Sequence, residues 1–324
     1  MTKLIQASAF AITVVLSSLP AVAQQTAWPE RSVRFIVPFP AGGPTDIIAR
    51  VVGQKMSERL GQTFVIDNRG GAGGVTGTDA VAKSAPDGYT MALTSAGALA
   101  ISPALQRMPY QPVKDLKPVS LVAKVPELLV VPPDSPAKDV AGFIALAKSR
   151  PGVLNYASTG LGSMPQLAAE LLKSTAGLSI VHVPYTGAAP AVNDLLVSRT
   201  DMLFADIPVL LPHVEAGKLR ALAVGSAERA PSMPNVPTFA EQGLKQVEAE
   251  NWYGIVVAGA TPAPIVAKLH AAIVEALKSP DVKDKLAPQG AILVGNTPEE
   301  FTAYILAETA KWGAVVKASG VKLE

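Results

Sequence analysis

Pro38-Phe-Pro-Ala-Gly-Gly-Pro-Thr-Asp46 is the stretch that decides the fold, together with Arg69-Gly-Gly-Ala-Gly-Gly74 and Ser158-Thr-Gly-Leu-Gly-Ser163. Each of these glycine-rich turns follows an apolar run of strand character and precedes a run of helical character. A helix N-terminus carries unpaired amide N–H groups and the positive end of the helix dipole. Because glycine has no side chain, a ligand can approach these amides closely. Several such turns around one cleft predict a carboxylate site that needs no buried arginine.

Strand and helix signals alternate along the chain on both sides of Pro126. Hydrophobic spacing before Pro126 gives a βαβαβ order, which predicts a parallel sheet covered by helices on both faces. A second α/β unit of similar size follows, and one more strand with three helices closes the chain. The predicted strands cover 33–37, 63–66, 89–93, 128–131, 154–157, 180–183, 202–205, 219–224 and 253–257. The predicted helices cover 47–60, 75–83, 137–149, 166–176, 189–198, 264–278, 281–286 and 298–319.

This order of elements predicts two lobes, with residues 24–126 plus 251–324 in the first and residues 127–250 in the second. The closing strand and helices either form a third domain or return to complete the first lobe. The boundaries above place them in the first lobe. Two lobes joined by a crossing chain enclose a hinged cleft. Ligands favour such clefts and lie outside the carboxyl ends of parallel strands.

Residues 1–23 have the pattern of a secretory signal. Lys3 gives a basic start, Leu4 to Leu19 is almost entirely apolar, and Ala21-Val-Ala23 is a cleavage site of the A-x-A type. A membrane anchor is the alternative, but the apolar run is shorter than the roughly 20 residues that span a bilayer. We therefore expect cleavage after Ala23 and a soluble protein exported to a bacterial periplasm.

Composition and missing motifs exclude several classes of function. The net charge is +2 over 324 residues with no basic stripe, which argues against nucleic-acid binding, and there are no cysteines. Walker A, dinucleotide-binding and nucleophile-elbow motifs are absent from the sequence. The three histidines His182, His213 and His270 lack metal-ligand spacing, and we interpret His182 as structural. We expect no metal, no cofactor and no catalysis.

Six segments, in this order, resemble the Bug receptors, the periplasmic solute receptors of the tripartite tricarboxylate transporter family. They are 28–46, 68–74, 86–90, 183–190, 229–238 and 252–254, and the resemblance runs from about Trp28 to the C-terminus. It implies a two-lobed α/β periplasmic binding protein of type II that acts as a monomer, binds a small carboxylate without catalysis and hands it to a membrane permease.

The resemblance also implies which residues bind the ligand. In the first lobe these are Ala41, Gly42, Gly43, Thr45, Gly73, Gly74, Thr94 and Ser95, and in the second they are Ser158, Thr159, Gly162, Tyr185, Thr186 and Asp206. The turn 94–101 departs from the family pattern because it carries small apolar residues where relatives often have a polar one. A smaller and more apolar pocket wall is expected there.

Several of these residues have a structural alternative. Thr45 fits a helix cap, Ser158 and Thr159 fit a cap of the next helix, and Tyr185 fits the core. Asp206 ends an apolar strand where a cleft residue is expected, but it also precedes a helix that it can cap. As a ligand contact, Asp206 would repel an anion's far end unless that end offers an N–H, ammonium or hydroxyl donor.

Two residues beside the loops are predicted to be structural. We interpret Asp46 as a helix cap or a partner of the dipole in the first helical turn, and Arg69 as one half of a surface ion pair. Two other functions stay open for the whole chain. One is a sensory receptor that reports to a membrane kinase, and the other is a periplasmic enzyme that acts on an organic acid.

Overall fold

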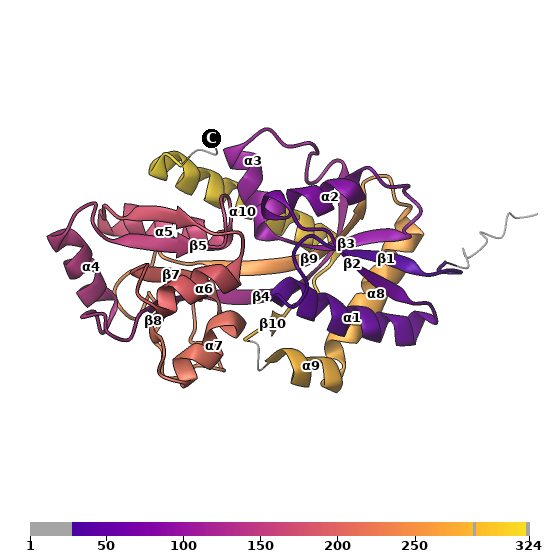
Figure 1. The fold of residues 1–324 in the computed structure, drawn as a ribbon. Coiled ribbons are helices and arrows are strands. Elements are labelled where there is room, and N and C mark those ends of the chain that lie inside the picture. Colours follow the sequence, from indigo (N-terminus) through magenta and orange to yellow (C-terminus); the bar gives the residue numbers. More distant parts are fainter. Residues whose placement is uncertain (1–27, 288–289, 322–324) are drawn as a thin grey trace, which may run out of the picture.

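The computed structural model describes residues 28–287 and 290–321, so the predicted secretory signal lies outside the described residues. Figure 1 shows two α/β lobes side by side, joined by strands that run through the middle of the molecule. Within the described residues no helix combines the length and apolar character that crossing a membrane requires.

The elements follow the predicted alternation. The strands are β1 (Val33–Val37), β2 (Phe64–Asn68), β3 (Thr90–Ser95), β4 (Leu116–Val131), β5 (Asn155–Ser158), β6 (Val181–Pro184), β7 (Met202–Asp206), β8 (Arg220–Val224), β9 (Glu250–Ala258) and β10 (Ile292–Leu293). The helices are α1 (Pro44–Leu60), η1 (Ala72–Gly74), α2 (Val75–Ala82), η2 (Gly97–Ile101), α3 (Ser102–Leu105), α4 (Val140–Ser149), α5 (Met164–Ala176), α6 (Ala188–Leu196), α7 (Ile207–Glu215), α8 (Ala263–Lys278), α9 (Pro280–Leu286) and α10 (Pro298–Ser319).

The sheet has the strand order β2-β1-β3-β9-β4-β7-β5-β6, with β8 and β10 both paired to β4. Strands β1, β2 and β3 are parallel, and so are β5, β6 and β7. β9 runs antiparallel between β3 and β4. The closing segment therefore completes the first lobe's sheet, and the alternative of a third domain is wrong.

β4 carries the chain from one lobe to the other. Residues Leu116 to Pro126 pair with β9, and Glu127 to Val131 pair with β7 and β8. The sequence predicted only the end of this strand, because Pro118 argues against a strand interior. The register shifts just after Pro118, so the irregularity accommodates a residue that cannot donate to the ladder. The lobe boundaries at 126/127 and 250/251 stay a prediction, supported by this change of pairing partner.

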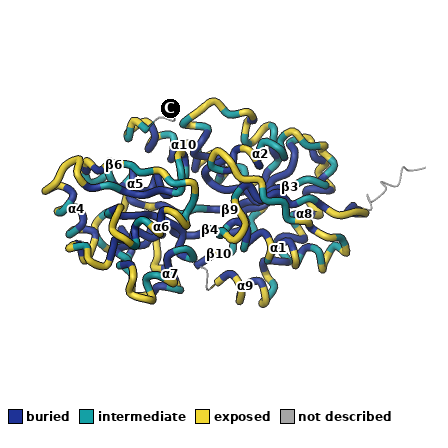
Figure 2. Tube along the Cα trace, in the orientation of Figure 1, coloured by how far each residue is buried: buried dark blue, intermediate teal, exposed yellow. Residues whose placement is uncertain are grey.

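Helices cover both faces of the first lobe, which is why its strands are continuous apolar runs. Phe35 packs with α1 and α8 on one face, whereas its neighbour Ile36 belongs to the core that includes α10 on the other. α10 also contacts η2 and α5. The core on the Ile36 face, to which α10 belongs, therefore extends from the first lobe into the second. Figure 2 shows β4 and β9 buried along most of their length. The predicted helix 298–319 matches α10 residue for residue, and a capping box of Thr297 and Glu300 fixes its start.

Candidate functional site

The glycine-rich turns lie at the carboxyl ends of their strands and meet where the two lobes face each other. The turn after β1 lies against the turn after β2, since a Cβ on Gly70 would be 3.7 Å from the Pro40 ring. The turn after β5 joins the turn after β6 through a hydrogen bond of 3.1 Å from the Tyr185 N–H to the Ser158 carbonyl. The edge predicted from strand order is therefore the edge at which the turns gather.

Contacts at Gly97 bring three of the turns together across the lobes. A Cβ on Gly97, directly after β3, would lie 3.2 Å from the Gly73 carbonyl oxygen and 3.5 Å from that of Gly162. A Cβ on Gly73 would in turn lie 3.6 Å from the carbonyl of Leu161. Gly73 and Gly162 both have positive φ, of 63° and 72°, which glycine adopts without strain. The sequence did not single out Gly97, because a glycine with ordinary φ in an apolar stretch carries no turn signal.

The first turn is held in shape by Asp46 of α1. Its carboxylate accepts from the Gly42 N–H at 2.9 Å, from Asn68 at 3.0 Å and from Arg50 at 2.8 Å. Burial acts to raise the pKa of Asp46, but these three donors together hold it below the ordinary value. The structural interpretation of Asp46 is confirmed. Because the Gly42 N–H is already used, the donors left at the start of α1 are those of Gly43 and the residues after Pro44.

Gly43 and Thr45 begin α1 at this turn, and Ala41 is exposed beside them. Gly43 occupies the N-cap position with extended backbone, and no side-chain cap is formed there. Thr45 therefore does not serve as the cap, contrary to the structural alternative. Its side chain is buried, and its hydroxyl lies beside the phenol of Tyr253 on β9.

The turn after β2 is rich in positive φ angles, which are 138° at Gly71, 63° at Gly73 and 95° at Gly74, and 47° at the one alanine, Ala72. Gly74 precedes α2 and uses its N–H to bond the Gly71 carbonyl at 3.0 Å. Arg69 forms an ion pair with Asp67 at 2.9 Å, which confirms its interpretation as a surface pair. In this turn Gly73 is the partly exposed predicted residue that lies nearest the opposite lobe.

Thr94 and Ser95 end β3 in the interior. The Thr94 hydroxyl is fully buried and pairs with the Thr78 hydroxyl at 2.7 Å, so it serves the packing of β3 against α2. Ser95 is paired in register with Tyr253 of β9, and its hydroxyl oxygen would lie 3.6 Å from a Cβ on Gly97. Of the two residues, Ser95 is thus the one beside the meeting point of the turns.

In the second lobe, Ser158 is the last residue of β5, directly before the glycine-rich turn. α5 begins at Met164 with Ser163 at its N-cap, so the alternative that Ser158 and Thr159 cap this helix is wrong. Ser158 is fully buried and its hydroxyl is 2.7 Å from His182 Nε2. The Gly162 N–H donates to the Gln166 side chain at 2.7 Å and is therefore occupied.

Tyr185 and Thr186 follow β6 in the neighbouring turn. The Tyr185 hydroxyl donates to Asp194 at 2.8 Å, and its ring packs partly against the second-lobe core. Thr186 is exposed. Tyr185 is therefore half-buried, and its contact with a ligand stays a prediction.

Asp206 lies in a buried polar cluster that the sequence did not predict. Its carboxylate accepts from the Tyr253 hydroxyl, and from Asn251 at 3.3 Å, both on β9. Asp206 precedes α7 but its side chain makes no capping bond, so the capping alternative is wrong. Since β9 is central to the first lobe's sheet, this cluster connects the end of β7 in the second lobe to the first lobe.

Glu127 stands directly opposite Asp206 on the adjacent strand β4. It is fully buried, and among the described residues no donor makes a well-aligned hydrogen bond to its carboxyl oxygens. A proton on Glu127 is nevertheless within reach of the Asp206 carboxylate, which gives the two acids a shared interaction. Glu127 is a single acid inside an apolar strand, a pattern that marks it in the sequence once the strand's true length is known.

Burial dominates the protonation of this pair. It raises the pKa of Glu127 well above its ordinary value, and the charge of Asp206 adds to the effect. Burial also raises the pKa of Asp206 to about 6, while its hydrogen bonds from Tyr253 and Asn251 act in the opposite direction. The two facing carboxyls therefore titrate as a coupled pair, in which the proton is held more strongly at Glu127 than at Asp206.

Replacing Glu127 by glutamine is expected to flatten the loss of stability with rising pH. Raised carboxyl pKa values mean that the folded protein binds more protons than the unfolded chain, so stability is full near pH 4 and declines as pH rises to 6 and beyond. Glutamine keeps the shape but does not ionise. Between pH 5 and pH 8 the free energy of unfolding of the variant, measured in urea, should fall by about 1–2 kcal/mol less than that of wild type.

The matched control is Glu299→Gln, at an exposed position on α10, which should leave the pH profile of stability unchanged. Parallel pH profiles for wild type and Glu127→Gln would show that the pKa of Glu127 is the same in the folded and unfolded protein.

Comparisons with known proteins agree with this geometry. Residues 48–321 match the family model described as "Tripartite tricarboxylate transporter family receptor". The chain is 40% identical to Protein BugT of Bordetella pertussis, covering 100% of this chain and 99% of that protein. Among solved structures, R. palustris Rpa4515 with adipate has 38% identity and a TM-score of 0.86, covering 91% of this chain and 99% of that one. MatC from Rhodopseudomonas palustris with bound malate has 35% identity and a TM-score of 0.83, covering 89% and 100%. The predicted two-lobed fold is confirmed.

Proposed function

The chain belongs to the tripartite tricarboxylate transporter receptor family, and from that premise we propose that it captures a small organic acid between its lobes. The ligand leaves unchanged, and the protein acts as a monomer in the periplasm after cleavage behind Ala23. Ligand binding favours the closed arrangement of the lobes over the open one, and the membrane permease recognises the closed form.

One observation carries the proposal: turns from both lobes meet at Gly97, where the carbonyl oxygens of Gly73 and Gly162 lie close to its Cα. A ligand held there contacts both lobes at once, so its binding stabilises the closed arrangement of the lobes relative to the open one. One carboxylate lies between the start of α1, at Gly43 and Thr45, and the turn after β5, at Ser158 and Thr159. Hydroxyl and amide donors of this kind bind a carboxylate directly or through water.

Asp206 sets the requirement for the far end of the ligand. Its negative charge near neutral pH disfavours a second carboxylate close by and favours a hydroxyl or ammonium donor. Rpa4515 holds adipate and MatC holds malate, and of these two acids only malate has a hydroxyl group. We therefore expect malate and aspartate to bind this protein more tightly than adipate or succinate does.

Calorimetric titration with these four acids tests the proposal. A dissociation constant in the micromolar range or below for at least one acid supports it, and a thermal shift with the same acid gives an independent readout. If none of the four binds at millimolar concentration, and a wider set of organic acids also fails, then capture of an organic acid is wrong.

Ser158→Ala should weaken binding of the best ligand about tenfold to a hundredfold, since a hydrogen bond to a charged group contributes about 1.5–3 kcal/mol. The matched control is Ser174→Ala, at an exposed position of α5, whose hydroxyl bonds only its own helix, to the Leu171 carbonyl. Equal affinities for Ser158→Ala and the control would show that the Ser158 hydroxyl does not bind the ligand.

A further inference from the structure

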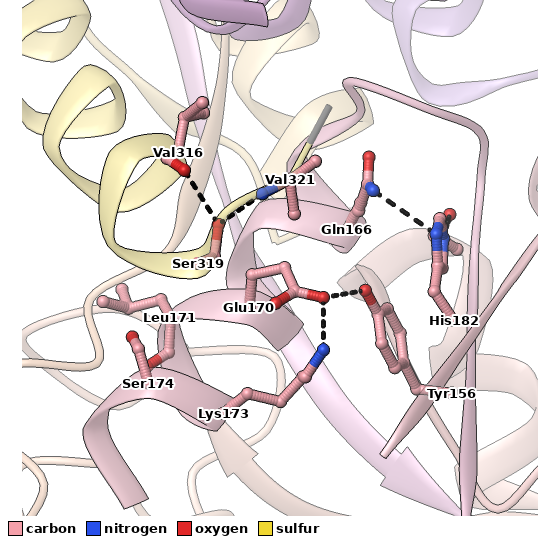
Figure 3. Close-up of polar contacts among 11 residues, drawn as sticks. Tyr156, Gln166, Glu170, Leu171, Lys173, Ser174, His182, Val316, Ser319 and Val321 are labelled. Carbon is pink, nitrogen blue, oxygen red and sulfur yellow. Dashed lines mark hydrogen bonds and ion pairs between the residues drawn. The ribbon is translucent and has the colours of Figure 1, made fainter. Parts of the chain in front are cut away.

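A continuous chain of hydrogen bonds runs behind the turn that carries Ser158. The Gly162 N–H donates to Gln166 Oε1 at 2.7 Å, and Gln166 Nε2 lies 3.3 Å from His182 Nδ1. The other ring nitrogen of His182, Nε2, is 2.7 Å from the Ser158 hydroxyl oxygen. Figure 3 shows Gln166 and His182 facing each other in this arrangement.

The direction of every bond in this chain follows from its first member. A main-chain N–H can only donate, so the Gln166 oxygen faces Gly162 and the Gln166 NH₂ group faces His182. An NH₂ group donates, which requires His182 Nδ1 to accept and therefore to carry no proton. A neutral imidazole has one N–H, which must then be at Nε2 and must donate to Ser158.

His182 is held neutral by its surroundings. Its ring stacks on Tyr156 with 4.7 Å between ring centroids, and burial lowers the pKa of His182 to about 4. Two charged groups act on the ring in opposite senses: Glu170 raises its pKa and Lys173 lowers it. These two charges form an ion pair of 2.7 Å with each other, and Glu170 also accepts from the Tyr156 hydroxyl at 2.5 Å.

The Ser158 hydroxyl can act toward a ligand only as a hydrogen-bond donor. Its oxygen accepts from His182 Nε2 and from the Gly160 N–H at 3.2 Å, which fills both of its acceptor positions. Within the turn its proton points at the Gly160 carbonyl, 3.2 Å away. That carbonyl already accepts a shorter bond of 2.6 Å from the Ser163 hydroxyl, so releasing the Ser158 proton to a ligand costs little.

We propose that His182 is a positioning residue that makes the Ser158 hydroxyl an obligate hydrogen-bond donor toward the ligand. The turn after β5 therefore takes an acceptor group, such as a carboxylate oxygen, and discriminates against an ammonium group, which has no acceptor, at the same place. This inference rests on the proposed capture of an organic acid, and it assigns the carboxylate to the Ser158 end and the donor group to the Asp206 end.

Reversing the chain of bonds tests the inference. In Gln166→Glu the carboxylate has no proton to give, so at pH 8 it accepts from both the Gly162 N–H and a proton on His182 Nδ1. His182 Nε2 then accepts from Ser158, which takes the hydroxyl proton away from the ligand. We expect the variant to bind the wild type's best acid about tenfold to a hundredfold more weakly, as for loss of one charge-assisted bond.

A double-mutant cycle separates this effect from charge repulsion by the new carboxylate. In a Ser158→Ala background there is no hydroxyl to redirect, so the further loss caused by Gln166→Glu should fall to less than about threefold. A loss of the same size in both backgrounds would mean repulsion alone and would overturn the inference, and so would wild-type affinity in Gln166→Glu.

The tautomer of His182 can be measured directly, and a purely structural role for His182 predicts no change of tautomer in Gln166→Glu. Nitrogen-15 NMR of ring-labelled protein, assigned with a His182→Gln variant, should show the Nε2–H form in wild type and the Nδ1–H form in Gln166→Glu. A wild-type Nδ1–H form overturns the inference even if Gln166→Glu does not fold. This measurement needs no ligand, so failure of the wild type to bind any acid would contradict the proposed function and leave the tautomer result standing by itself.

Discussion

Gly43→Val is expected to reduce the affinity for the bound acid by about a hundredfold or more, equivalent to about 2.7 kcal/mol, while the protein stays folded. Gly43 is the N-cap of α1, where φ is −81° and ψ is 171°, an extended conformation that valine adopts readily. The one protein atom near an added Cβ is the Pro40 carbonyl oxygen at 3.7 Å, an ordinary contact distance. The added methyl groups instead occupy the space in front of the α1 N-terminus, where we place the ligand's carboxylate.

The stability of Gly43→Val decides what a loss of binding means. Valine is a poorer N-cap than glycine, so a cost of up to about 1 kcal/mol in urea unfolding is expected. Gly43→Ala should bind with intermediate affinity, because its single methyl group fills less of the space. If Gly43→Val binds like wild type, the ligand is not held at the start of α1. If it unfolds, Gly43→Ala alone carries the test.

Gly254→Ala is expected to destabilise the folded protein by about 3 kcal/mol, at the upper end of the usual cost of overpacking. A Cβ on Gly254 of β9 would lie 2.0 Å from Phe301 Cζ and 2.5 Å from Cε1. Phe301 is fully buried on α10 and packs edge-on against Trp252 with 5.8 Å between ring centroids, so it has little freedom to retreat. Urea unfolding at pH 7 measures the effect.

Two comparisons make the Gly254 result specific. Gly313→Ala on α10 adds the same methyl group where the nearest atom, the Ala104 Cβ, is 4.0 Å away, and should be neutral or stabilising by up to about 1 kcal/mol. In a Phe301→Ala background the clash is gone, so the cost of Gly254→Ala should largely disappear. An undiminished cost there would show that Phe301 is not the cause.

The sequence alone predicted the fold class and most elements, because their signals are local. Strand Val33–Val37 and helix Pro298–Ser319 have the predicted bounds, since apolar spacing and capping residues act within one element. The glycine-rich turns were also located correctly at the carboxyl ends of their strands. The length of β4 was missed because Pro118 is a local signal against a strand, and only pairing with β9 overrides it.

The candidate site was predicted less completely. The ligand-binding roles of its residues stay a prediction, but the structure shows that several amides proposed as donors are already used within their own turns. The Gly42 N–H bonds Asp46, the Gly74 N–H bonds Gly71, and the Gly162 N–H bonds Gln166. A glycine motif predicts where the chain turns, but it does not reveal which side chain from further along the chain will satisfy the exposed amide.

By itself, then, the sequence determined what depends on neighbours in the chain: the alternation of strands and helices, and the turns that carry the proposed site. Tertiary structure alone decided which distant groups meet, as in Glu127 against Asp206, Tyr253 beside Thr45, and His182 behind Ser158. The physical reason is that hydrogen-bond direction and carboxyl protonation depend on burial and on partners a few ångströms away in space. Neither is fixed by the spacing of residues along the chain.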